Sequence, residues 1–379
     1  MKILIITNIT LEPYLGIKLN ELFSSKSLSL DIITLSIMES LTMKESLKEV
    51  GIVVFLINLE TLLPNWYIDV SLDTDSKTIV NNVINLVNQL NANICDNFDG
   101  LILWFGFEDY NIERHHVFGC VPVADGFADR LNERVKQEVH NNVFIDLKWI
   151  VAEVGITNAY SSKGKFRWNA PYTKLLIDTM ASEIYKQHLI YTGKSRKCIV
   201  LDCDNVLWGG ILSEDGINEV KLSCDGLGRE FQEFQRFILD LYYHGMILAI
   251  CSKNDKTDVL QMIDKHPDMI LKRNYFSIIK ANWKDKVTNL IDISIYLNIG
   301  LDSIVFVDDS AYEIGLINNA LPDVFAIRYN KNTIFEALSC INLKENADIA
   351  SIERRNETYR TNELRENLRT QSGSIDEYL

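Results

Sequence analysis

Short apolar runs alternate with amphipathic stretches along the first half of the chain. Helical periodicity appears between or after these runs, at Thr78–Leu90 and at Tyr172–Tyr185. Strands that alternate with helices build a mostly parallel sheet, so this part of the chain predicts an α/β domain. The apolar runs are Lys2–Thr7, Leu30–Leu35, Gly51–Leu56, Gly100–Trp104 and Val143–Asp146.

A later apolar run, Cys198–Leu201, leads two aspartates, Asp202 and Asp204, into a turn. Such a run indicates a buried parallel strand, and open α/β sheets bind ligands beyond the carboxyl ends of their strands. Two carboxylates one residue apart can divide the work, because one can attack phosphorus while the other handles protons. Taken alone, the motif has two alternatives: a common Asp-x-Asp turn or a loose cation site.

Two further features supply groups that suit a phosphate. The apolar run that starts at Gly245 ends in the hydroxyl of Ser252 beside the cation of Lys253. Lys286 stands at the head of an amphipathic helix pattern, where a lysine can neutralise a bound phosphate. For Ser252 the alternative is a strand-end cap.

A third apolar run, which starts at Ser303, ends in two adjacent acids, Asp308 and Asp309. Together with Asp202 they could hold a hard cation such as Mg²⁺ through oxygen ligands. Asp309 could instead cap the helix that begins after it.

The order of these groups resembles the four motifs of the haloacid dehalogenase (HAD) superfamily. Within it, the chain looks like the FkbH-like proteins of subfamily III C, from about Arg196 to about Tyr329. The segments that carry this resemblance are Asp-x-Asp-Asn-x-Leu-Trp-Gly-Gly from Asp202, Glu214-Asp-Gly, Cys251-Ser-Lys-Asn-Asp, His266-Pro-Asp-Met and Val307-Asp-Asp-Ser.

The resemblance implies a role for each catalytic residue. Asp202 is the nucleophile that becomes an aspartyl-phosphate, and Asp204 protonates the leaving oxygen and later activates water or another acceptor. Ser252 and Lys286 hold the transferring phosphoryl group. Because phosphoryl transfer has a loose, charge-spread transition state, positioning and charge neutralisation carry most of the catalysis.

The same resemblance implies a Mg²⁺ site and a substrate surface. Asp308 ligates the ion directly, with Asp202 and the backbone carbonyl of Asp204, while Asp309 orients a metal-bound water. The positions expected to contact substrate are Ser252, Lys253, Asn254, Trp208 and Gly209.

The chain departs from the family pattern in a few places. Cys203 should point away from its aspartate neighbours, because strand side chains alternate, and is expected to be a buried structural thiol. After the acid pair the chain keeps Glu313 but lacks the arginine of its relatives, which puts in doubt any substrate contact of that arginine. Only about 45 residues separate Asp204 from Ser252. There is no room for a large cap domain, so an open site is expected.

The first domain stands where FkbH-like proteins have an SGNH-hydrolase-like domain. An SGNH enzyme presents a serine just after the first strand, but Asn8 follows Thr7 here, and Phe166–Pro171 stands where an Asp-x-x-His pair would be. Esterase activity is therefore not expected, and a docking or substrate-orienting role is favoured. The segment Trp104–Asp109 leaves its strand at the ligand end, with core aromatics as the alternative to substrate contact.

Composition narrows the class of protein. The 379 residues suffice for two domains, and 38 basic against 52 acidic residues give a net charge of −14. The basic residues form no run with interleaved aromatics, so nucleic acid is not an expected partner. Seven scattered cysteines without a Cys-x-x-Cys pair argue against zinc and suit the cytoplasm. No apolar stretch is long enough to span a membrane.

We therefore predict two Rossmann-like three-layer α/β/α domains and a helical tail. The SGNH-like domain is expected at 1–192, the HAD-like domain at 193–342 and the charged tail at 343–379. In full-length FkbH-like proteins a similar segment leads into an acyltransferase-like domain, which makes a downstream acyltransferase a candidate partner.

Three functional hypotheses follow. The first is a Mg²⁺-dependent phosphatase or phosphotransferase that acts on a small phosphorylated metabolite, glyceryl- or sugar-derived, in secondary-metabolite or surface-glycan synthesis. The second, implied by the resemblance, is a glyceryl transferase that dephosphorylates 1,3-bisphosphoglycerate and loads the glyceryl unit onto an acyl carrier protein. The third is a non-catalytic module that binds a partner.

Overall fold

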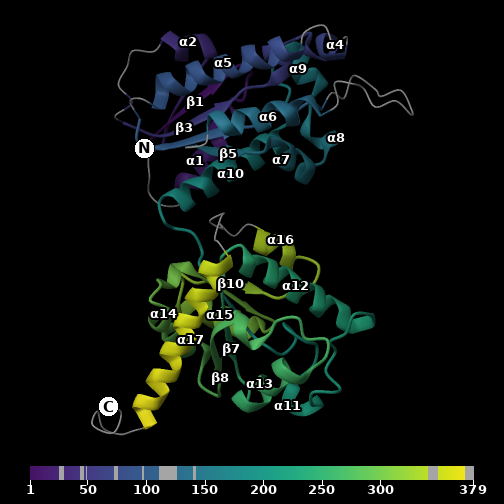
Figure 1. Ribbon diagram of the computed structural model, residues 1–379, viewed down its shortest axis with the longest axis vertical. Coiled ribbons are helices and arrows are strands. Elements are labelled where there is room, and N and C mark those ends of the chain that lie inside the picture. Colours follow the sequence, from purple (N-terminus) through teal and green to yellow (C-terminus); the bar gives the residue numbers. More distant parts are fainter. Residues whose placement is uncertain are drawn as a thin grey trace. The chain divides into compact units, whose positions relative to one another are not determined.

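The computed structural model describes residues 1–24, 30–42, 47, 49–71, 76–95, 98–110, 126–139, 142–339 and 349–371. The chain divides into two compact units, Met1–Tyr191 and Thr192–Leu379. Each unit contains a five-stranded parallel sheet with helices on both faces (Figure 1). No helix in the described ranges is long and apolar enough to cross a membrane.

The first unit has the strand order β2-β1-β3-β4-β5. Its strands are β1 (Lys2–Thr7), β2 (Asp31–Leu35), β3 (Val50–Leu56), β4 (Leu101–Phe105) and β5 (Val143–Ile145). Its helices are α1 (Tyr14–Ser24), α2 (Ile37–Thr42), α3 (Leu59–Leu62), α4 (Trp66–Ser71), α5 (Ser76–Cys95), α6 (Phe127–Glu138), α7 (Leu147–Val154), α8 (Ile156–Ala159), α9 (Ser162–Trp168) and α10 (Lys174–Tyr191).

Side-chain alternation along β1 builds two cores, one on each face of this sheet. Ile3 and Ile5 pack into the core that also contains α1 and α10, whereas Leu4 and Ile6 pack into the core that contains α5 and α6. Consecutive strand residues point to opposite faces, so a strand that is apolar at every position must be covered on both sides. The apolar runs of β1, β3 and β4 therefore become central strands, whereas those of β2 and β5 form the two edges of the sheet.

The second unit has the strand order β10-β9-β6-β7-β8. Its strands are β6 (Cys198–Leu201), β7 (Ile247–Ser252), β8 (Phe276–Ala281), β9 (Ile304–Asp308) and β10 (Phe325–Arg328). Its helices are α11 (Leu212–Asp215), α12 (Arg229–Tyr243), α13 (Lys256–Lys265), α14 (Lys286–Leu297), α15 (Ala311–Ala320), α16 (Ile334–Ser339) and α17 (Ile349–Gln371), with three 3₁₀ turns at Gly226–Gly228, Arg273–Tyr275 and Leu301–Ser303.

The segment between β6 and β7 contains only short elements and one longer helix, in line with the prediction that it has no room for a large cap domain. It holds the four-residue α11, one 3₁₀ turn and α12, and an isolated antiparallel bridge joins Gly209 to Lys221. These elements do not amount to a second domain over the sheet. The side chain of Cys203 is fully buried in the core of one sheet face, which confirms the expected structural position of this thiol.

Helix α17 belongs to the second unit through its contacts. Ile352 packs into the core on one face of the sheet, and Tyr359 packs against the core on the other face. Between them, the buried Asn356 accepts a hydrogen bond from the Ser277 hydroxyl at 2.7 Å and donates one to the carbonyl of Tyr275 at 3.1 Å. The helix thus crosses the edge of the sheet at β8.

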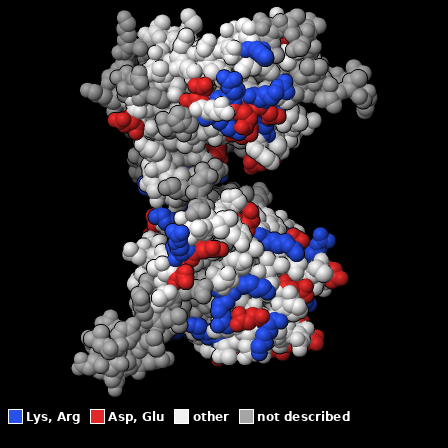
Figure 2. Space-filling view, viewed as in Figure 1, with Lys and Arg blue, Asp and Glu red and all other residues white. Residues whose placement is uncertain are grey.

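Charged side chains of both signs are interspersed over the visible face of each unit (Figure 2). On that face the excess of acidic residues is therefore not gathered into one patch.

Candidate active site

The chemically active residues of the second unit meet at the carboxyl edge of its sheet. Asp202 follows the last residue of β6, Ser252 ends β7 and Asp308 ends β9. Strand β6 lies between β7 and β9, and all three run parallel, so their carboxyl ends are neighbours. The backbone nitrogen of Asp202 donates to the carbonyl of Val307 at 2.9 Å, which fixes the two acidic strand ends side by side.

Lys286 joins these two strand ends. Its ammonium lies 2.9 Å from Oδ2 of Asp202 and 2.6 Å from Oδ2 of Asp308, and all three side chains are buried. Lys286 is the first residue of α14, and Asp285 caps this helix by accepting a hydrogen bond from the Thr288 nitrogen at 2.8 Å. Burial alone would lower the pKa of Lys286, but the charges of Asp202 and Asp308 outweigh burial and raise it. The lysine is therefore a permanent cation between the two acids.

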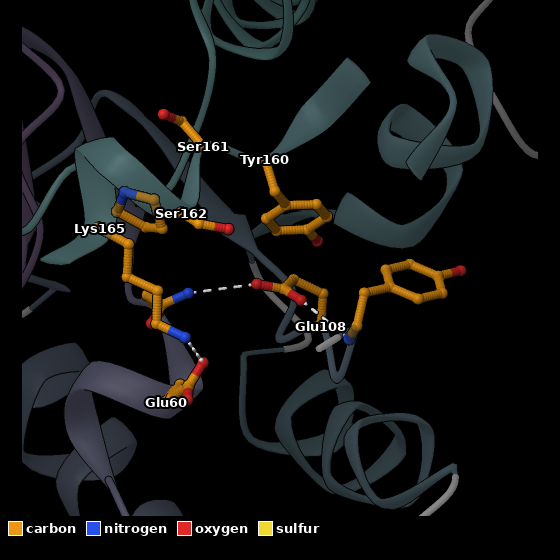
Figure 3. A pocket seen from close by; sticks show the side chains of 9 residues that line it. Glu60, Glu108, Tyr160, Ser161, Ser162 and Lys165 are labelled. Carbon is orange, nitrogen blue, oxygen red and sulfur yellow. Dashed lines mark hydrogen bonds and ion pairs between the residues drawn. The ribbon is translucent and has the colours of Figure 1, made fainter. Parts of the chain in front are cut away.

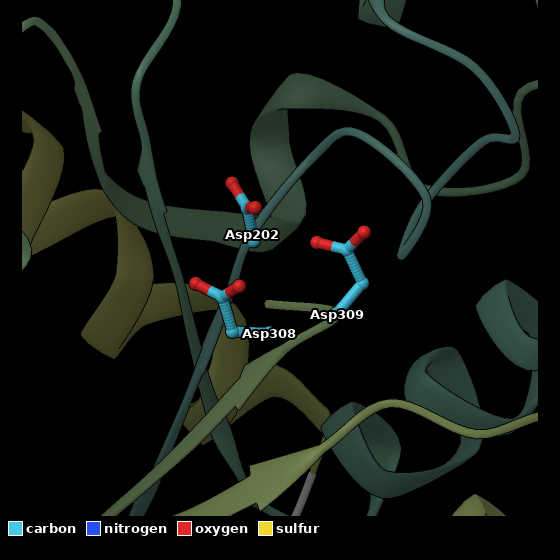
Figure 4. A group of neighbouring side chains, drawn as sticks. All are labelled: Asp202, Asp308 and Asp309. Atoms are coloured by element: carbon cyan, nitrogen blue, oxygen red, sulfur yellow. The ribbon is translucent and has the colours of Figure 1, made fainter. Parts of the chain in front are cut away.

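Asp202, Asp308 and Asp309 form a compact group of carboxylates (Figure 4). One oxygen of each lies within 4.8 Å of one oxygen of the others. Oδ1 of Asp202 is buried and has no hydrogen-bond partner among the described residues. Burial raises the pKa of Asp202 to about 6, against the lowering effect of Lys286, and burial together with Asp308 raises the pKa of Asp309. An unsatisfied buried carboxylate oxygen beside two further carboxylates fits a hard divalent cation.

Asp204 is held apart from this cluster by three hydrogen-bond donors. Its Oδ1 accepts from Nε1 of Trp208 at 2.9 Å and from the backbone nitrogen of Leu212 at 3.1 Å. Its Oδ2 accepts from Nδ2 of Asn254 at 2.9 Å. Asn205 has a left-handed backbone, with φ of 56°, and its side chain accepts from the Gly210 nitrogen at 2.9 Å. The turn after β6 therefore separates the two aspartates and orients the second one independently.

Several residues that the resemblance assigns to substrate binding contact this turn or its neighbours in the structure. The ring of Trp208 is fully buried, and Asn254 is buried with its amide donating to Asp204 and to Oγ of Ser252. Gly209 exchanges two backbone hydrogen bonds with Lys221, at 3.0 and 2.8 Å. Lys253 is more exposed, and its ammonium lies 2.6 Å from Oε1 of Glu313.

Two supporting residues were not predicted from the sequence. Gln235 on α12 donates to the carbonyl of Leu207 at 2.7 Å and accepts from the nitrogens of Ile270 and Leu271. The sequence could have indicated Gln235, because it is a polar residue in the apolar face of an amphipathic helix. Ser310, and not Asp309, caps α15 by accepting from the nitrogen of Glu313, so the alternative role considered for Asp309 is wrong.

Two comparisons relate this chain to known phosphatase domains. Residues 197–333 match the family model of the NLI interacting factor-like phosphatases. No curated protein matches. A solved structure of the N-terminal part of a Bacteroides fragilis protein, which contains a phosphatase domain and is complexed with Mg, is 22% identical in sequence with a TM-score of 0.76. The match covers 92% of this chain and 95% of that chain.

The second unit is similar to known phosphatase domains. The structural match, at its low sequence identity, confirms the fold of two α/β units in series. A HAD family enzyme from Bacteroides thetaiotaomicron, complexed with magnesium and inorganic phosphate, is 13% identical over 38% of this chain and 99% of that chain, but its TM-score of 0.27 is too low to add to this conclusion. The FkbH-like branch and the SGNH-like character of the first unit stay predictions.

We expect Lys286→Met to destabilise the protein by about 3–5 kcal/mol, because it leaves Asp202 and Asp308 buried without their shared cation. Urea unfolding, monitored by circular dichroism at pH 7.5 without divalent ions, measures this loss. The matched control is Lys284→Met, which removes an exposed lysine two residues away and should change stability by less than about 0.5 kcal/mol. Equal stability of the two variants would show that Lys286 does not hold the acids in place.

Proposed function

We propose that the second unit catalyses Mg²⁺-dependent phosphoryl transfer, as a phosphatase or phosphotransferase that forms an aspartyl-phosphate. The observation that carries the proposal is the separation of two aspartates one residue apart. Asp202 lies in the carboxylate cluster beside Lys286, whereas Asp204 is held by three uncharged donors outside that cluster. This separation supports a division of roles in which one carboxylate attacks phosphorus and the other transfers protons.

Each residue then has a physical task. Asp202 attacks phosphorus, and Asp204 gives a proton to the leaving oxygen and later accepts one from the attacking water. Lys286 offsets negative charge on the phosphoryl group and on Asp202. The hydroxyl of Ser252 lies at the carboxyl end of the strand next to β6, where it can donate to a phosphoryl oxygen.

Asp202, Asp308 and Asp309 are the residues that would hold Mg²⁺. When bound, the ion supplies charge neutralisation to the transferring phosphoryl group. The magnesium in the Bacteroides fragilis structure supports this part of the proposal. The backbone carbonyl of Asp204 stays a ligand that only the family resemblance implies.

For the substrate we propose a small phosphorylated metabolite of glyceryl or sugar origin, in a cytoplasmic secondary-metabolite or surface-glycan pathway. The support is the FkbH-like sequence framework around the acids together with the short segment between β6 and β7, which leaves space for a bulky or carrier-bound group. Glyceryl transfer to an acyl carrier protein is the alternative within the same framework. Mass spectrometry after incubation with 1,3-bisphosphoglycerate and a carrier protein distinguishes the two by the presence of a glyceryl adduct.

Asp202→Asn should lower phosphate release by about four orders of magnitude or more, because the amide is not a nucleophile. The measurement is phosphate release from a panel of phosphorylated metabolites with Mg²⁺ present, together with thermal unfolding to confirm the fold. Asp258→Asn, an exposed acid on α13, serves as the control and should keep wild-type activity. Retained turnover in Asp202→Asn would refute the proposed nucleophile, and a lack of release by the wild-type protein would favour the non-catalytic hypothesis.

Trp208→Phe should lower kcat about tenfold while KM changes little, because it removes one of three hydrogen bonds that orient Asp204. This is a fraction of the roughly 10²- to 10⁴-fold that general acid–base catalysis contributes. Because a purely structural defect would lower the active fraction at every pH alike, the pH profile of kcat is recorded too. A shift of the limb of the pH profile that reports protonation of Asp204 supports a positioning role for Trp208. An unchanged pH profile together with a normal kcat contradicts that role.

A further inference from the structure

The first unit contains a small polar cavity that the proposed phosphoryl transfer does not use. Its volume is about 20 Å³, and a cavity needs roughly 10–15 Å³ to hold one water. The cavity therefore admits one slender group of about the size of a water molecule. The residues in its wall include Asn58, Glu60, Glu108, Tyr160, Ser162 and Lys165 (Figure 3).

The cavity lies beyond the carboxyl ends of β3 and β4. Asn58 follows β3 by two residues, and Glu108 follows β4 by three. The carboxyl ends of parallel strands are where open α/β sheets bind their ligands. Its position in the first sheet thus corresponds to the position of Asp202 in the second.

The carboxyl group of Glu108 is the buried acid of this cavity. Its Oε1 accepts hydrogen bonds from Nδ2 of Asn58 at 3.1 Å and from the hydroxyl of Tyr172 at 3.2 Å. Its Oε2 accepts from the backbone nitrogen of Tyr110 at 3.1 Å. An ionised carboxylate has room for about four hydrogen bonds, so one position remains for another donor.

No cation pairs with Glu108 within the described part of the chain. Lys165, the cation in the cavity wall, lies 2.8 Å from Oε2 of Glu60, so these two charges compensate each other. Buried charges in proteins are usually paired. Burial raises the pKa of Glu108 to about 7, in keeping with an acid that lacks a counterion.

Tyr160 lies beside Glu108 in the cavity (Figure 3). Its hydroxyl oxygen is buried and makes no hydrogen bond of ordinary length among the described residues, but the hydroxyl is close enough to the Glu108 carboxyl that each group shifts the pKa of the other. Its ring packs edge-on against Tyr172, with ring centroids 5.8 Å apart. A carboxylate that lacks a counterion, a neighbouring hydroxyl oxygen that can accept a hydrogen bond and aromatic rings together favour an ammonium group, which carries charge and several donors.

We propose that this cavity binds the primary ammonium group of a small molecule. The ammonium donates to the remaining position on the Glu108 carboxylate and to the hydroxyl oxygen of Tyr160, and its charge compensates that of Glu108. A neutral alcohol of the same size fills the space but leaves the carboxylate charge uncompensated, and an anion is repelled by it. The site is independent of the phosphoryl transfer proposed for the second unit.

The pH dependence of binding follows from the groups around Glu108. Burial raises the pKa of Tyr160 and of Tyr172, so both stay neutral near pH 7. The neighbouring Asp109 is paired with Lys148 at 2.8 Å, and the pair of Glu60 and Lys165 lies in the wall. An alkylammonium keeps its charge up to about pH 10, as lysine does. Binding should therefore tighten as pH rises through the pKa of Glu108, because only the ionised acid attracts the cation.

The test is titration of the full-length protein with methylammonium chloride at constant ionic strength, followed by NMR chemical shifts at pH 6 and pH 8. Affinity should be about tenfold higher at pH 8, as expected for a site that requires ionisation of a group with a pKa near 7. Methanol, the neutral probe of the same size, should not saturate the site. Equal binding of methanol and methylammonium, or affinity that falls as pH rises, would overturn the proposal.

Three variants complete the test. Glu108→Gln keeps the shape of the side chain and should lower methylammonium affinity at pH 8 at least tenfold and remove its pH dependence. Ser162→Phe places a bulky ring at the exposed mouth of the cavity and should abolish binding even if Glu108→Gln proves unstable. Glu133→Gln, on the exposed face of α6, should bind as the wild type does. Unchanged affinity in Ser162→Phe would contradict binding at this cavity.

Discussion

The ion pairs between Lys286 and the two buried acids, Asp202 and Asp308, are the interaction on which the rest of the second unit depends. Asp202, Asp308 and Asp309 carry three negative charges when all are ionised, and the ammonium of Lys286 compensates one of them. Two negative charges therefore remain at the edge of the sheet. This equals the charge of a divalent cation. Burial is the main cause of the raised pKa of Asp202, and the charge of Asp308 adds to it, against the lowering effect of Lys286.

Two kinds of environment give chemically identical side chains different tasks. Asp202 faces a cation and other acids, so its charge is controlled by electrostatics. Asp204 faces an indole, an amide and a backbone nitrogen, so its direction is controlled by hydrogen bonds. A single turn of backbone with a left-handed residue at Asn205 separates these environments.

The sequence predicted the edge of the second sheet well, because each polar group there follows an apolar run whose direction is fixed in a parallel sheet. Strands β8 and β10 were missed. Ser277 and Lys280 interrupt the apolar pattern of β8, and β10 is an exposed edge strand. The hydrogen bond from Trp208 to Asp204 could not be predicted either, because the partner of an indole depends on packing that the linear motif does not specify.

Helix α17 has a consequence beyond packing. Strand β8 is the last strand on its side of the sheet, and an uncovered edge strand offers its free backbone groups to strands of other chains. By spanning from one core to the other, with Asn356 bonded to the backbone of Tyr275, the helix occupies the space that a sixth strand would need. The sheet thus ends at β8 because α17 blocks its growth, which protects a strongly apolar parallel sheet against edge-to-edge association.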